Sequence, residues 1–177
     1  DVEEAVRELR ETLDKSVERS ERTVRELVKK LETSVEETRE EVERVVEELD
    51  RVVEEAKKDV SEKIVDEIRK LVDKLRKEAK KVLEDSKRKV DELRKEAKKV
   101  VDESRERAEK LKKDLDERGA GAKEVRKEVK ELVERDEDLV RKIREKVEKV
   151  VKDNKDLLRR IREAAKRVVR EIRERLR

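Results

Sequence analysis

The sequence predicts an all-α protein, a long-helix antiparallel bundle with a three-helix cross-section. Three observations support this prediction: apolar residues recur at steps of three and four, 60% of the residues are charged, and 177 residues contain no proline. A chain rich in Ala, Glu, Lys, Leu and Arg at helical spacing is typical of a coiled coil or long helix. High charge with few apolar residues is also typical of disorder. The regular apolar stripe decides in favour of helices.

The first 118 residues have one continuous stripe of mostly apolar residues, with a few Ser and Thr, which runs from Val2 to Leu115. Its steps average about 3.6 residues, the period of a straight α-helix, whereas a supercoiled heptad has 3.5. We therefore expect a continuous helix over 1–118, with half-segments 1–56 and 64–118. The alternative is a turn near residue 60, in KKDVSEK (57–63), where Asp and Glu have the spacing of a capping box.

The only two glycines, Gly119 and Gly121, lie together in DERGAGAKEV. Gly119 suits the left-handed residue that follows a helix, and Gly121 gives the chain a second permissive position. The glycines predict a loop over 119–121 and a second helix over 122–177. We expect the two helices to form a single structural unit.

An 18-residue repeat, about five helical turns, is visible where LRKEAKKVLEDS (75–86) returns as LRKEAKKVVDES (93–104). In many turns the stripe is doubled, as in Leu27 with Val28 and Leu157 with Leu158. A doubled stripe needs two neighbouring helices to cover it, which predicts the three-helix cross-section.

Polar residues interrupt the stripe at mirrored positions. Folding the last helix back about residue 120 places Asp136 opposite Ser104 and Asn154 opposite Ser86. A second mirror at residue 60 adds one serine from the first half-segment to each pair. The sequence thus predicts two polar layers in the core, Ser16/Ser104/Asp136 and Ser34/Ser86/Asn154.

The mirror at residue 60 has two physical explanations. In one, an unbroken helix runs antiparallel to its copy, with a two-fold axis beside Val60, which gives a domain-swapped homodimer. In the other, a tight turn gives a monomeric three-helix bundle. We expect the homodimer, because the segment has neither Gly nor Pro. Either arrangement brings the acidic residues 1–55, with net charge −9, against two basic segments.

Composition disfavours most functional classes. Without His or Cys, a Ser/Ser/Asp layer has no base to activate a nucleophile, so we expect no enzyme, catalytic residue, cofactor site or small-molecule substrate. Acidic runs such as 36–48 spread around a helix, so no metal site is expected. Net charge +3 argues against nucleic acid, and no apolar run approaches a membrane span of about 18 residues. We expect a soluble protein of unassigned compartment, with itself as partner.

Taken together, the 18-residue repeat, the uniform Val, Leu and Ile stripes, the mirrored polar layers and the absence of aromatic residues resemble computationally (de novo) designed straight helical bundles. The resemblance covers the whole chain. It implies a structural scaffold that self-assembles and has no natural biochemical activity, with hydrogen-bond layers that select helix register. The alternatives are a natural filament-like coiled-coil protein and a lipid-surface amphipathic helical protein, although the basic C-terminal stretch AAKRVVREIRERLR lacks aromatic anchors.

Overall fold

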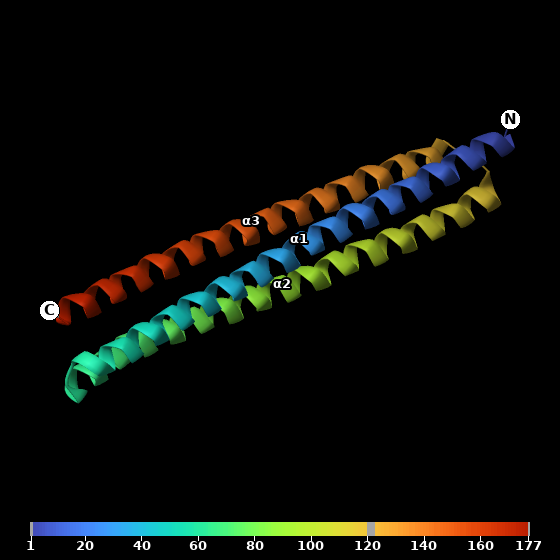
Figure 1. The fold of residues 1–177 in the computed structure, drawn as a ribbon. Coiled ribbons are helices and arrows are strands. Elements are labelled where there is room, and N and C mark those ends of the chain that lie inside the picture. The colour runs from blue at the N-terminus through green and yellow to red at the C-terminus, as the bar shows by residue number, and fades with distance from the viewer. Residues whose placement is uncertain (1, 120–122, 177) are drawn as a thin grey trace. The chain divides into compact units, whose positions relative to one another are not determined.

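The computed structural model describes residues 2–119 and 123–176. It consists of three long helices, α1 (Val2–Asp59), α2 (Glu62–Arg118) and α3 (Lys123–Arg175), joined by short connections (Figure 1). No strand occurs among the described residues. The all-α prediction and the packing of three helices against one another are confirmed.

The contacts divide the chain into two compact units, each with segments of all three helices. Unit 1 comprises Asp1–Lys30 and Asp91–Glu148, and unit 2 comprises Leu31–Val90 and Lys149–Arg177. The sequence predicted a single structural unit, whereas the contacts group the chain into two compact units. The reason is physical: a side chain on a long helix reaches only the neighbouring segments within a few turns along the axis.

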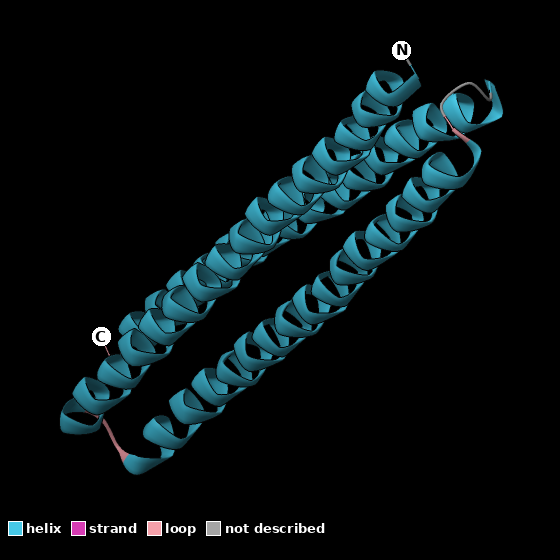
Figure 2. Cartoon of the chain, turned by 90° about the vertical axis from the view of Figure 1, so that its right-hand side faces the viewer, coloured by secondary structure: helices cyan, strands magenta, loops and turns pink. Residues whose placement is uncertain are grey.

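The expected continuous helix over 1–118 is wrong, because α1 ends at Asp59 and α2 begins at Glu62. Only Val60 and Ser61 separate them, and Figure 2 shows this connection as the short pink loop without grey. The carbonyl of Ser61 accepts hydrogen bonds from the N–H groups of Ile64 and Val65, each at 3.1 Å. Ser61 therefore occupies the N-cap position of α2, two residues after the Asp that the sequence suggested as a cap.

Charged residues on both sides of the turn stabilise the two helix ends, although the segment contains neither Gly nor Pro. Lys57 and Lys58 lie in the last turn of α1, and Glu62 lies in the first turn of α2. Both placements complement the helix dipoles. Val60, expected beside a two-fold axis in the middle of a helix, lies instead in the turn, half-buried against the core of unit 2.

The second connection begins as predicted. Gly119 has φ of 75°, the left-handed region, and its N–H donates to the carbonyl of Leu115 at 3.0 Å. This bond is the one that closes a helix in the αL motif. Gly121 lies outside the described residues, so the remainder of the predicted 119–121 loop stays a prediction.

Ion pairs define the register of the helices. In unit 1, three side chains of α1 pair with side chains of α2 in reverse order along the chain: Arg10 with Asp116, Asp14 with Lys112, and Glu21 with Arg105. This order makes α1 and α2 antiparallel. The hydrogen-bonded pairs between α1 and α3 are 120 residues apart in both units, so these two helices run parallel.

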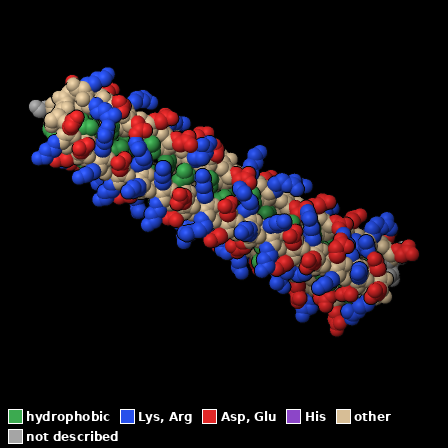
Figure 3. Space-filling view, turned by 90° about the horizontal axis from the view of Figure 1, so that it is seen from below, with side chains coloured by type: hydrophobic (Ala, Val, Ile, Leu, Met, Phe, Trp, Pro, Cys, Tyr) green, Lys and Arg blue, Asp and Glu red, His purple; other side chains and the backbone are tan. Residues whose placement is uncertain are grey.

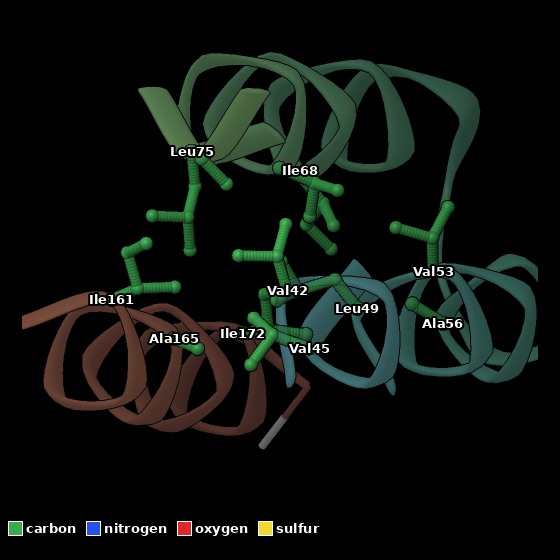
Figure 4. Close-up of a cluster of buried hydrophobic side chains, with 12 residues drawn as sticks. Val42, Val45, Leu49, Val53, Ala56, Ile68, Leu75, Ile161, Ala165 and Ile172 are labelled. Carbon is green, nitrogen blue, oxygen red and sulfur yellow. The ribbon is translucent and has the colours of Figure 1, made fainter. Parts of the chain in front are cut away.

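Each unit has an apolar core from all three helices. Figure 4 shows the cluster in unit 2, where side chains of the three helices point toward one another. In unit 1 a cluster around Leu115 joins α1, the end of α2 and the start of α3. The buried members are, in unit 2, Val42, Val45, Leu49, Val53, Ala56, Ile68, Val72, Leu75, Ala79, Ile161, Ala165 and Ile172, and, in unit 1, Leu13, Leu115, Val125, Val129 and Leu132.

Candidate functional site

The polar layer of unit 2 is a complete hydrogen-bond chain. Ser34 of α1, Ser86 of α2 and Asn154 of α3 are 8%, 2% and 3% exposed. The hydroxyl of Ser86 donates to Asn154 Oδ1 at 2.8 Å, and Asn154 Nδ2 donates to Ser34 Oγ at 3.0 Å. The structure thus brings together the three residues that the sequence placed in this layer. The amide of Asn154 links the other two helices.

The polar layer of unit 1 is only partly bonded. Ser16 of α1 donates to Asp136 Oδ2 of α3 at 3.0 Å. Ser104 of α2 and Asp136 are each 1% exposed, but neither the hydroxyl of Ser104 nor Asp136 Oδ1 has a hydrogen-bond partner among the described residues. All three predicted residues are therefore buried, and only two of them are bonded to each other.

Arg107 supplies the positive charge for this layer, and the sequence analysis missed it. Its Nη2 lies 3.9 Å from Asp136 Oδ1, and its side chain is 24% exposed. Arg107 follows Ser104 by three residues, so both lie on the same side of α2. The spacing of Arg107 from Ser104 could have indicated this contact, because a basic residue one turn from a polar core position can reach a buried carboxylate.

Thr38 and Ser20 are buried polar residues outside the predicted layers, and Thr38 is the more deeply buried of the two. Thr38 is 1% exposed, and its hydroxyl donates to the backbone carbonyl of Ser34 at 2.7 Å. A threonine that bonds to its own helix four residues back needs no partner from another helix. Thr38 therefore fills a core position without specifying which helix lies opposite.

Ser86 of α2 is hydrogen-bonded and Ser104 of α2 is not, so replacing each with alanine should change the stability of the protein differently. Ser86→Ala removes the bond to Asn154 and leaves its amide oxygen buried, so we expect the free energy of unfolding to fall by about 1–3 kcal/mol. Ser104→Ala removes a buried hydroxyl that has no partner, so we expect no loss or a small gain. Urea unfolding of both variants measures the contrast, and equal losses would contradict it.

The chemical capacity of the layers is limited by their burial. Ser16 donates its proton to the carboxylate of Asp136, and the described contacts of this layer include no second base. Nucleophilic catalysis needs a base, an oxyanion site and room for a substrate. Across residues 2–119 and 123–176, no group of three potential metal-ligating side chains is close enough to hold an ion. The arrangement suits helix recognition.

Ion pairs between the acidic first helix and the basic second helix reinforce the layer of unit 1. The guanidinium of Arg105, hydrogen-bonded to the carboxylate, lowers the pKa of Glu21. The carboxylate of Asp14 raises the pKa of Lys112 through a hydrogen bond. Both shifts favour the charged forms, so the pairs persist at neutral pH. Each pair joins a half-buried side chain to an exposed one, and such pairs contribute to the choice of neighbour more than to stability.

No protein-family model matches this chain, and no curated protein or solved structure matches it. None of the described helices has an apolar stretch long enough to span a membrane. Over the face shown in Figure 3, acidic and basic side chains are interleaved, with apolar atoms visible between them.

Proposed function

We propose that this protein is a designed structural scaffold, a helical bundle whose task is its own assembly, without a natural biochemical activity. The single observation that supports this function is the hydrogen-bond chain from Ser86 through Asn154 to Ser34. It takes one residue from each of the three helices. A buried polar layer of this kind is a known means of specifying register and helix pairing.

The polar layers make alternative registers of the helices less stable than the native one. Moving α3 by one turn would take the Asn154 amide away from the hydroxyls of Ser34 and Ser86. Each buried polar group left without a partner costs about 1–3 kcal/mol. The apolar stripe itself discriminates weakly between such registers, because Val, Leu and Ile recur in every turn. The apolar residues thus supply the stability, and the polar layers supply the selection.

The observed turn favours a single-chain form of this scaffold. One chain provides all three helical segments of each unit, so we propose a monomer as the principal form. A domain-swapped homodimer is the second candidate. Its support is the connection of only two residues, Val60 and Ser61, without Gly or Pro. If these two residues became helical, α1 and α2 would join and the first helix would pack on a second copy.

Light scattering across a dilution series distinguishes the two forms. A constant mass of 21.2 kDa is the expected result, and twice that mass would instead support the homodimer. Two variants make the test sharper. Inserting Gly-Gly-Ser between Val60 and Ser61 should preserve the monomer, whereas Val60→Ala with Ser61→Ala should increase the dimer by favouring a continuous helix.

Circular dichroism tests the alternative function on lipid surfaces. A lipid-surface protein remains partly unfolded until vesicles are added. The scaffold proposal requires full helicity and cooperative unfolding in buffer alone. A large rise in helicity on adding anionic vesicles would overturn it.

A further inference from the structure

A groove between α1 and α3 in unit 2 has no role in the proposed scaffold. Its volume is about 530 Å³. The floor is apolar, from Val45, Ala165 and Val169, and Figure 4 shows the first two of these in the core cluster. The remaining lining residues are charged: Glu41, Arg44, Glu48, Arg162, Lys166, Arg170 and Arg173.

The α3 side of the groove is a row of cations. Arg162 is paired with Glu41 at 2.8 Å. The next three, Lys166, Arg170 and Arg173, are exposed and form no ion pair with any residue that the structure describes. They are four and three residues apart, so they lie on one side of the helix over about 10 Å. The groove thus combines an apolar floor with an uncompensated basic edge.

We infer that this groove binds an acidic amphipathic helix. The apolar side of such a helix would pack on the half-buried Val169, above the already buried Val45 and Ala165, and its carboxylates would face the three cations. A helical partner is favoured because cations separated by helical steps match carboxylates separated by the same steps. A folded second copy fits less well, because its apolar stripe is already buried in its own core.

Charge within unit 2 shows the same complementarity. Residues 31–59 of α1 contain 12 acidic and 5 basic side chains, whereas residues 149–177 contain 5 acidic and 12 basic ones. The pair between Glu41 and Arg162 shows how a carboxylate of an acidic helix meets the edge of α3. Glu41 neutralises Arg162 but leaves the three other cations of the edge without partners. Carboxylates on a second helix would neutralise these three cations.

The chain itself provides a suitable probe, a synthetic peptide of residues 31–59 with a fluorescent label. This peptide is acidic and has the apolar spacing of α1. Fluorescence anisotropy with the full-length protein should show saturable binding at one peptide per chain. Because charge steers the association, raising the salt from about 0.05 to 0.5 M should weaken the affinity severalfold.

A pair of charge-matched variants tests the location. Lys166→Glu/Arg170→Glu/Arg173→Glu reverses the groove edge and should weaken binding at least tenfold. The control, Lys149→Glu/Arg160→Glu/Arg167→Glu, changes the net charge equally at exposed positions of α3 that do not line the groove. It should retain the affinity within about twofold to threefold. Circular dichroism of both variants checks that the fold is kept.

Four results would overturn the inference. Absence of saturable binding by the unmodified protein is one. Equal weakening by both triple variants is another, because it indicates attraction by net charge alone. Slow incorporation that neither variant affects is the third, since it indicates exchange of the peptide for α1 in the bundle. Self-association of the protein alone with the same salt and edge dependence would identify a second copy as occupant, and that also contradicts the proposal.

Discussion

Replacing Asp136 with leucine is expected to retain or raise the free energy of unfolding, by at most about 4 kcal/mol, because the partly exposed Arg107 can turn its charge toward water. Asp136 is 1% exposed and accepts one hydrogen bond, from Ser16. The nearest positive charge is Arg107, whose Nη2 lies 3.9 Å from Asp136 Oδ1. The cost of removing this carboxylate from water is therefore poorly offset. Leucine has the same number and branching of side-chain heavy atoms, so it replaces the carboxylate with little change in shape. Urea unfolding measures the gain.

Asn154→Leu is the matched control for this gain. Asn154 is equally branched and equally buried, but both of its side-chain groups are bonded, to Ser86 and Ser34. Leucine there leaves two serine hydroxyls without partners, so we expect a much smaller gain or a loss. If Asn154→Leu stabilised the protein as much as Asp136→Leu, the bonding state of each layer would not explain the difference.

The double variant Asp136→Leu/Asn154→Leu tests the selection role. We expect its stability to be kept or raised while its specificity falls, because a stripe of Val, Leu and Ile alone accepts several registers. Light scattering and hydrogen exchange should show mixed species or reduced protection. A double variant that retains one oligomeric state and native protection would undercut the proposed scaffold mechanism.

Leu115→Ala is expected to lower the free energy of unfolding by about 2–5 kcal/mol. Leu115 is fully buried in the core of unit 1, among Leu13, Val125, Val129 and Leu132. Its carbonyl accepts a hydrogen bond from Gly119, and its side chain packs against both α1 and α3, which limits how far the backbone can move to fill a cavity. Guanidinium unfolding followed by circular dichroism measures the loss.

Leu111→Ala provides the comparison for this cavity. Leu111 packs against the same cluster one turn earlier in α2, but it is only half-buried. Solvent can fill the space that alanine leaves there, so the loss should be distinctly smaller. Losses of equal size would mean that burial in this core does not determine the stability of unit 1.

The polar layers show how far sequence reasoning reached into the site. Mirroring the stripe about residues 60 and 120 placed Ser34, Ser86 and Asn154 together, and the structure bonds them. Register can be derived in this way because helical rise is constant and no irregular element interrupts the count. Hydrogen bonding was less predictable. Whether Ser104 reaches Asp136 depends on rotamers and distances of a few tenths of an ångström, which spacing does not encode.

The sequence by itself determined the helical class, the apolar faces, the antiparallel order and the helix end at Gly119, because each follows from local periodicity or from one residue's backbone freedom. Only the tertiary structure decided that the chain turns at Val60 and Ser61, and that Arg107 approaches Asp136. Local signals at 57–63 are compatible with both a helix and a turn. Packing of the apolar faces of α1 and α2 is non-local, and within one chain this burial requires the turn.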